Sequence, residues 1–234
     1  MKTLILGLAL VPAAMAATPA AATVILPGQT GMVFTPLDTT TRGTLLSSTT
    51  QSGTAATISG TVAEAVYRNT FGTLDFYFQV FRTGGTAEID ALNVSSFAGY
   101  LVDAFTDGTD FDGAGPFATV NNPTLADGTP SGSTTRVGRS NDGSVMRVDF
   151  GLNGLTGSEN STTYIFRTNA INFAPQTGNA TVSNGTSFNV LAPQPIGPAV
   201  PEPATWAMMI LGMASVGYAA RRNRSRVATR VRFG

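Results

Sequence analysis

Val145-Met-Arg-Val-Asp-Phe-Gly-Leu152 is the stretch that most clearly decides the fold. Apolar side chains occupy its even positions from Met146 to Leu152, and most odd positions are polar or small. A period of two is typical of a β-strand with one buried face and one wet face. The preceding Ser140-Asn-Asp-Gly-Ser144 contains residue types that tolerate the left-handed conformations of a hairpin loop. The sequence therefore predicts that residues 135–139 and 145–152 pair as an antiparallel hairpin.

The rest of residues 17–191 has the same character. Leu74-Asp-Phe-Tyr-Phe-Gln-Val-Phe81 alternates in the same way and is predicted to be a central strand with a half-covered second face. Further strands are predicted at residues 31–35, 60–67, 89–95, 100–105, 162–168 and 186–191. No apolar period of 3.6 residues extends beyond two turns, so the class is all-β. About nine strands favour an antiparallel β-sandwich, with a small barrel as the alternative.

Two segments between and after these strands lack a strand pattern. Residues 106–133 are rich in Gly, Asp and Pro and are predicted to form an extended loop. Residues 192–200 contain Ala192-Pro-Gln-Pro-Ile-Gly-Pro198, which indicates a semi-rigid spacer after the domain. The chain has no Cys, so neither disulfides nor a structural Cys-zinc site stabilise the domain.

The first 16 residues have the pattern of a signal peptide. Lys2 precedes a short apolar stretch, and Ala14-Met15-Ala16 forms an A-x-A cleavage site before Ala17. The stretch is too short to span a membrane. The sequence therefore predicts an exported protein.

The C-terminal segment combines a helix signal with an uncharged run. Residues 204–220 contain no charge, and Pro203 suits the first turn of a helix. At about 1.5 Å per residue, such a helix is about 26 Å long, near the lower limit for a bilayer. Six arginines follow in the basic tail 221–234, whereas Glu202 is the charge on the other flank. We therefore expect a single transmembrane helix at 204–220 with a cytoplasmic C-terminus.

This segment also resembles a known sorting signal. Its ordered features are Pro201, Glu202, Pro203, Trp206, Ala207, the uncharged run, Arg221 and Arg222. They resemble the PEPxxWA variant of the PEP-CTERM sorting signal over residues 201–234, although the tail beyond Val227 is longer than such signals usually are. The resemblance implies a Gram-negative exported protein whose tail is recognised and cut by exosortase in the inner membrane. It also implies a mature form at the cell surface or outside the cell, in strains that commonly make exopolysaccharide.

The charge of the middle of the chain excludes one class of partner. Residues 17–200 carry seven arginines and 13 carboxylates, although the whole chain is neutral. Nucleic-acid binding needs a concentrated basic face. Nucleic acid is therefore not an expected partner, and the tail arginines are explained by membrane topology.

The available catalytic chemistry is limited because the chain has neither His nor Cys. Ser-His-Asp and Cys-His catalysis are excluded, and carboxylate chemistry remains. A glycosidase would need two placed carboxyl groups, for which the candidates are Glu64, Asp75, Glu88, Asp90, Asp103, Asp149 and Glu159. Nothing in their spacing pairs any two of them, so a non-enzymatic protein is expected.

A candidate calcium site lies at the start of the long loop. Asp103, Asp107, Asp110 and Asp112 are interspersed with glycines, and hard oxygen ligands on a loop suit Ca²⁺. The segment does not fit an EF-hand, since Asn121 stands where that loop needs Glu. The alternative is that Asp and Gly form turns here.

Carbohydrate binding is the other alternative. Sugar platforms favour Trp, but Trp206 belongs to the sorting tail. Tyr67, Tyr77, Tyr100 and Tyr164 could substitute, although buried tyrosines are the favoured interpretation. The expected function is thus an exported, non-enzymatic protein associated with exopolysaccharide or a biofilm matrix. A carbohydrate- or calcium-binding module is the alternative, and a carboxylate glycosidase is the third choice.

Overall fold

The computed structural model describes residues 24–107, 111–121, 135–151, 154–197 and 203–224. The predicted signal peptide, with Ala14, Ala16 and Ala17 at its cleavage site, lies outside these residues. Pro201 and Glu202 of the predicted sorting motif also lie outside them.

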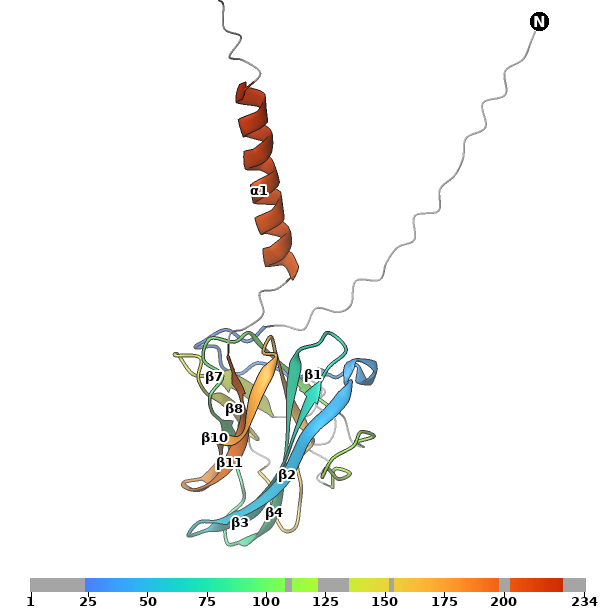
Figure 1. Ribbon diagram of the computed structural model, residues 1–234. Helices are drawn as coiled ribbons and strands as arrows, with labels where there is room; N and C mark the ends of the chain where they lie inside the picture. The colour runs from blue at the N-terminus through green and yellow to red at the C-terminus, as the bar shows by residue number, and fades with distance from the viewer. Residues whose placement is uncertain (1–23, 108–110, 122–134, 152–153, 198–202, 225–234) are drawn as a thin grey trace, which may run out of the picture.

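The described residues form two β-sheets (Figure 1). The six-stranded sheet has the order β1 (Thr35–Pro36), β6 (Val102–Thr106), β9 (Tyr164–Thr168), β4 (Leu74–Gly85), β3 (Ile58–Arg68) and β2 (Thr44–Thr54). The five-stranded sheet has the order β11 (Thr186–Ile196), β10 (Asn172–Asn184), β5 (Ala91–Val94), β8 (Met146–Asp149) and β7 (Arg136–Arg139). Neighbouring strands are antiparallel except β1 and β6, which are parallel. A 3-10 helix, η1 (Thr39–Thr41), follows β1, and the helix α1 (Pro203–Arg224) follows the sheets.

One hydrophobic core joins the two sheets. Val62 and Phe76 from the six-stranded sheet and Leu92 and Val148 from the five-stranded sheet are fully buried in the same cluster. Such burial of two apolar faces against each other is the main stabilising contribution in an all-β domain. The prediction of an all-β class is therefore confirmed.

The predicted hairpin is confirmed. Arg139 is opposite Met146, so β7 and β8 pair antiparallel around the Ser140–Ser144 loop. Met146 and Phe150 are fully buried, whereas Arg147 between them is exposed. Leu152 lies outside the described residues. The alternation of apolar and polar residues thus reported the buried face correctly.

Two long strands were not predicted, and the start of the spacer was predicted wrongly. β2 and β10 were not predicted, because their Ser, Thr and Asn side chains give no apolar alternation. The predicted spacer begins too early, since residues 192–196 are the last part of β11. Pro193 and Pro195 are tolerated there because β11 is an edge strand, where a missing N–H donor costs little.

One side of the two-sheet domain is closed by the N-terminal segment. The Ile25 N–H donates to the Val102 carbonyl of β6 at 2.8 Å, and Met32 forms a bridge with Val137 of β7. Arg139 reinforces this side, because its buried guanidinium donates to the carbonyls of Ile25, Phe97, Tyr100 and Gly143 at 2.8 to 3.0 Å. Backbone from one segment thus bridges both sheets here.

The opposite side is closed differently. β2 and β11 are the last strands of their sheets and do not belong to one hydrogen-bonded ladder. Gln51 of β2 spans the gap, because its Nε2 donates to the Leu191 carbonyl of β11. This side is called the β2–β11 seam below.

Helix α1 overlaps the predicted transmembrane segment 204–220. Among the described residues, no helix is both long enough and apolar enough to cross a membrane, so the predicted transmembrane helix is not confirmed. The uncharged run is short, and Gly212, Ser215 and Gly217 dilute its apolar content.

Candidate functional site

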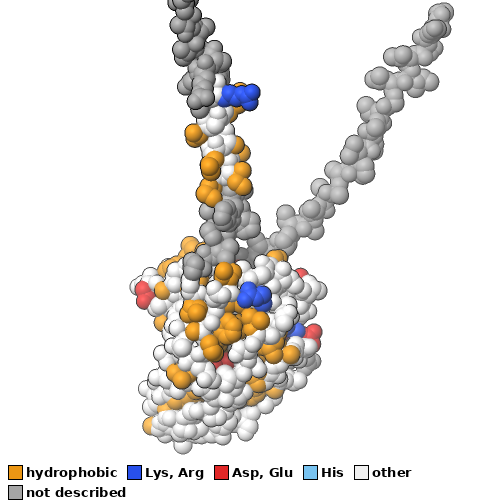
Figure 2. Space-filling model, viewed as in Figure 1, with side chains coloured by type: hydrophobic (Ala, Val, Ile, Leu, Met, Phe, Trp, Pro, Cys, Tyr) orange, Lys and Arg blue, Asp and Glu red, His pale blue; other side chains and the backbone are white. Residues whose placement is uncertain are grey.

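The sorting tail presents an exposed apolar helix. Six large apolar side chains of α1 are 49 to 72% exposed: Met209, Ile210, Leu211, Met213, Val216 and Tyr218. Figure 2 shows hydrophobic side chains along the described part of this helix. Arg221 at its end is also exposed, whereas the side chains of Pro203, Trp206, Ala207 and Arg222 lie outside the description. An apolar surface of this kind is typical of a segment that binds a membrane or another protein.

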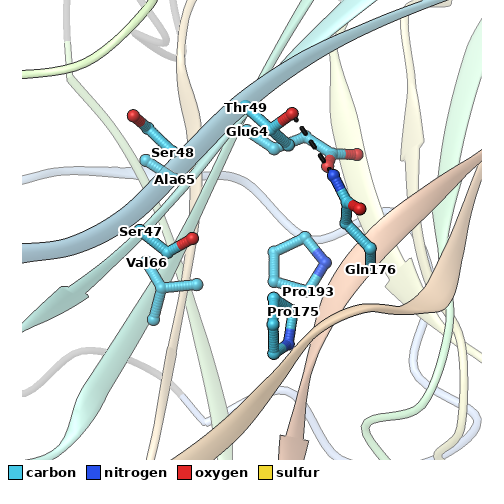
Figure 3. Close-up of a pocket in the computed structure, with 9 residues that line it drawn as sticks. All are labelled: Ser47, Ser48, Thr49, Glu64, Ala65, Val66, Pro175, Gln176 and Pro193. Atoms are coloured by element: carbon cyan, nitrogen blue, oxygen red, sulfur yellow. Dashed lines mark hydrogen bonds between the residues drawn. The ribbon is translucent and has the colours of Figure 1, made fainter.

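A second candidate site lies in the β2–β11 seam. A pocket of about 120 Å³ opens there, and its walls include Ser47, Thr49, Glu64, Pro175, Gln176 and Pro193 (Figure 3). The residues come from β2 and β3 of one sheet and from β10 and β11 of the other. The pocket therefore exists only because the edges of the two sheets meet.

Glu64 is the acidic residue of this pocket. It lies on the same face of β3 as Val62 and Val66, so its side chain points between the sheets and is fully buried. Gln51 Nε2 donates to Glu64 Oε2 at 3.5 Å, but Oε1 has no hydrogen-bond partner among the described residues. Burial raises the pKa of Glu64 to about 8, and the hydrogen bond from Gln51 opposes this effect.

Gln176 enters the pocket from an irregular part of β10. The pairing of β10 with β11 shifts register between Ala174 and Gly178, and Gln176 has a φ of 52°. A residue with a side chain is rare in this left-handed region, and the conformation costs roughly 1 kcal/mol or more. The bulge directs the side chain toward β2, where Gln176 Nε2 lies 3.5 Å from Thr49 Oγ1 (Figure 3).

The structure does not bring the predicted glycosidase carboxylates together as a pair in this pocket. Cross-strand pairing puts Glu64 opposite Phe78, so Asp75 points to the other face of the six-stranded sheet. There Asp75 is fully buried and accepts hydrogen bonds from Arg167 Nε and Nη2 at 2.8 to 3.1 Å. The partly buried Arg167 guanidinium therefore neutralises the fully buried Asp75 carboxylate.

The other candidate carboxylates lie elsewhere. Asp149 pairs with Arg147 at 3.0 Å on the exposed face of β8. Glu159 accepts a hydrogen bond from the Thr156 N–H at 2.6 Å in a turn. Glu88 is exposed. Partial burial of Asp90 raises the pKa of Asp90, and the nearby Glu88 charge raises it further.

The predicted calcium ligands are partly engaged by Arg42. Asp107 accepts from Arg42 Nη2 at 2.6 Å, and Asp112 accepts from Arg42 Nη1. Burial raises the pKa of Asp107 to about 6, although the Arg42 charge opposes it. Asp103 lies on β6, and Asp110 lies outside the described residues. Within the described ranges no group of three acidic side chains could hold a metal ion, and calcium binding stays a prediction.

Three of the four tyrosines considered for sugar binding are core residues. Tyr67, Tyr77 and Tyr164 are at most 2% exposed. Tyr100 is half-buried, and its hydroxyl donates to the Gly197 carbonyl at 2.5 Å. The favoured interpretation of buried tyrosines is confirmed for Tyr67, Tyr77 and Tyr164, and these three rings form no exposed platform for a sugar.

Glu64 was one of the seven predicted carboxylates, but its pattern in the sequence does not distinguish it from the other six. The other pocket residues were not predicted from the sequence: Thr49, Pro175, Gln176 and Pro193. The available signal was weak: Pro175-Gln176 inside a polar run can mark a bulge. The register that brings Thr49 and Gln176 together could not be read from the sequence, because the two residues are 127 positions apart.

Comparison with known proteins assigns the tail. Residues 199–224 match the family model of the PEP-CTERM protein-sorting motif. The match indicates a tail of the kind that an exosortase sorts, and it does not extend over the two sheets. No match was found among curated proteins or among solved structures. The chain thus carries a PEP-CTERM sorting motif that includes helix α1 and follows the two sheets.

Proposed function

We propose that this chain is an exported, non-enzymatic β-sandwich protein that uses its C-terminal tail as a temporary membrane anchor. An exosortase recognises and cuts the tail, and the mature domain then reaches the cell surface or the extracellular space, where it associates with exopolysaccharide. The motif match at residues 199–224 is the observation that carries the proposal.

The exposed side chains of α1 support the anchoring step. Six large apolar side chains are exposed on α1, and this surface favours insertion of the helix into lipid or its binding to the exosortase. The arginines after residue 220 favour a cytoplasmic C-terminus. The segment before α1 is expected outside the cytoplasm, where an exosortase acting at the inner membrane can reach it.

The placement of the carboxylates supports a non-enzymatic role. Glu64 and Asp75 point to opposite faces of the six-stranded sheet, and Asp75 is held by Arg167. A glycosidase needs its two carboxyl groups on either side of one scissile bond.

The tail can be tested in the native host. Pro201 and Pro203 are expected to disfavour helix at the residues that precede them, which would leave the segment around Glu202 accessible to a protease. Pro201→Ala combined with Pro203→Ala is expected to block tail removal, so that an uncut form accumulates in the inner membrane. Fractionation followed by intact-mass measurement of each fraction would report both cleavage points.

Pro198→Ala is the matched control, because Pro198 precedes the matched residues and its replacement is expected to leave processing unchanged. Normal tail removal in the double variant would contradict the role given to the prolines. Full-length, uncut protein in the cytosol of the unmodified host would overturn the proposal of exosortase sorting itself.

A further inference from the structure

Two unusual features meet in the β2–β11 seam pocket. Glu64 is fully buried and its Oε1 has no hydrogen-bond partner among the described residues, which is costly for a polar atom. Gln176 holds a strained left-handed conformation that turns its side chain toward Thr49. Strained residues cluster at functional sites, and a buried polar atom without a partner needs a physical explanation. Other described residues, such as Asp90 and Thr106, also have a buried oxygen without a hydrogen-bond partner, so the meeting of the two features in one pocket is what distinguishes this site.

Glu64 is expected to be uncharged at neutral pH. The side chains around it come from β2, β4 and the β10–β11 hairpin, and they include Thr49, Gln51, Phe78, Gln176 and Pro193. None of these five carries a charge, and no charged group contributes to the raised pKa of Glu64. A neutral carboxyl group is the form that burial without a cationic partner favours.

The hydrogen bonds of the pocket define what it can recognise. Gln51 Nε2 donates to Glu64 Oε2, so the carboxyl proton belongs on Oε1, which then needs an acceptor. The Gln176 amide and the Thr49 hydroxyl offer both donors and acceptors. Pro175 and Pro193 add apolar walls that suit the C–H groups of a ligand. Hydroxyl groups on a carbon skeleton complement this combination.

We propose that the β2–β11 seam pocket binds a neutral hydroxylated ligand, with Glu64 donating a hydrogen bond to a ligand oxygen and Gln176 and Thr49 binding a neighbouring hydroxyl. The pocket volume of about 120 Å³ is below the roughly 300 Å³ at which pockets for whole small molecules begin. It therefore takes one end of a ligand, such as the edge of a terminal sugar unit. This site does not depend on sorting of the tail.

Binding can be measured with the purified full-length chain. The probes are methyl glucoside, methyl galactoside, methyl mannoside and glycerol, titrated at millimolar concentrations and followed by saturation-transfer difference NMR. At least one probe is expected to bind in a saturable manner. Failure of all four to bind would overturn the proposal.

Variants distinguish a binding role from a structural role. Glu64→Gln keeps a donor and is expected to retain affinity within about threefold, whereas Glu64→Leu removes it and is expected to lose about tenfold. Gln176→Gly is expected to weaken binding about fivefold or more while stability is kept or raised, because strain is relieved. Thr49→Ala is expected to weaken binding, whereas Thr50→Ala is the matched control, since Thr50 is exposed on the other face of β2. Equal affinities for Thr49→Ala, Gln176→Gly and the unmodified chain would contradict the site.

The pH dependence separates a hydroxylated ligand from a cationic one. Since the protonated form of Glu64 is the donor, affinity is expected to fall about tenfold from pH 6 to about pH 9, and Glu64→Gln is expected to show no such change. Methylammonium is the competing probe. If its binding is saturable and strengthens as pH rises, Glu64 recognises a cation, and the proposal of a neutral ligand is overturned.

Discussion

Replacing Glu64 by Gln tests the state of the buried carboxyl group directly. Gln has nearly the same shape and keeps a hydrogen-bond donor and acceptor, but it does not ionise. An ordinary Glu has a pKa of 4.5, and burial raises the pKa of Glu64 in the folded chain to about 8. The folded state therefore holds the proton more tightly than the unfolded state. The stability contributed by protonated Glu64 is fully present below about pH 4.5 and is lost as the pH rises toward about 8.

The size of the effect follows from these two pKa values. Each log unit between pH and the unfolded pKa corresponds to about 1.4 kcal/mol of unfolding free energy, up to the folded pKa. Relative to acid pH, ionisable Glu64 thus lowers the free energy of unfolding by about 3 kcal/mol at pH 7 and by about 5 kcal/mol above pH 8, to within a factor of two. We expect Glu64→Gln and the unmodified chain to be equally stable near pH 4. At pH 7 the variant is expected to be more stable by about 3 kcal/mol, or roughly 6–12 °C in Tm.

Urea unfolding of both full-length chains from about pH 4 to about pH 9 would measure this difference, because other titrating groups cancel in the comparison. Glu88→Gln, at an exposed carboxylate, is the matched control, and from about pH 6 to about pH 9 its difference from the unmodified chain is expected to stay constant, because the Glu88 charge affects the titration of Asp90 in the acid range only. A free-energy difference between Glu64→Gln and the unmodified chain that stays constant with pH would refute the reasoning. It would mean that Glu64 is ionised in the folded protein or that the pocket admits bulk water.

Two further substitutions test the packing that holds the sheets. Arg167→Met leaves the fully buried Asp75 carboxylate without its cation, and it is expected to lower the free energy of unfolding by about 3–5 kcal/mol in urea. Arg147→Met, at an exposed ion pair, is expected to lower it by less than about 1 kcal/mol. Similar losses for the two variants would show that burial does not make the Arg167–Asp75 pair important. Gly43 has a φ of 76°, and a Cβ added there would overlap the neighbouring backbone, so Gly43→Ala is expected to destabilise the fold by about 2–5 kcal/mol in thermal melting. Gly31 has a similar φ of 71° but open space around it, so Gly31→Ala is expected to cost about 1–2 kcal/mol. An equal change in Tm for the two glycine variants would exclude the steric contribution.

The sequence predicted those strands whose side chains alternate between core and solvent. The stretch from Val145 belongs to this class and buries its apolar face as expected. The stretch from Leu74 also buries its apolar face, but the predicted half-covered second face is wrong, because Asp75, Tyr77 and Gln79 are fully buried as well. β2 and β10 were missed because their Ser, Thr and Asn side chains give no apolar alternation. β2 is an edge strand, whereas β10 lies between β11 and β5. Pairing with a neighbouring strand, which sequence does not display, makes them strands.

The sorting motif was predictable for a different reason. The motif is defined by the linear order of Pro201, Glu202, Pro203 and the apolar run, so it can be identified in the sequence without knowledge of the fold. The predicted membrane span was not confirmed among the described residues, and the uncharged run is near the minimum length for a bilayer.

By itself, the sequence determined the all-β class, the buried faces of the alternating strands and the sorting motif, since each is carried by residues that follow one another along the chain. Only the tertiary structure decided that Glu64 faces a pocket and Asp75 faces Arg167, because that choice depends on strand register and sheet packing. It also decided that Thr49 and Gln176 meet across the seam, although 127 positions separate them along the chain. A carboxyl group looks the same in every sequence, and its chemistry is set by the dielectric and the hydrogen bonds that folding places around it.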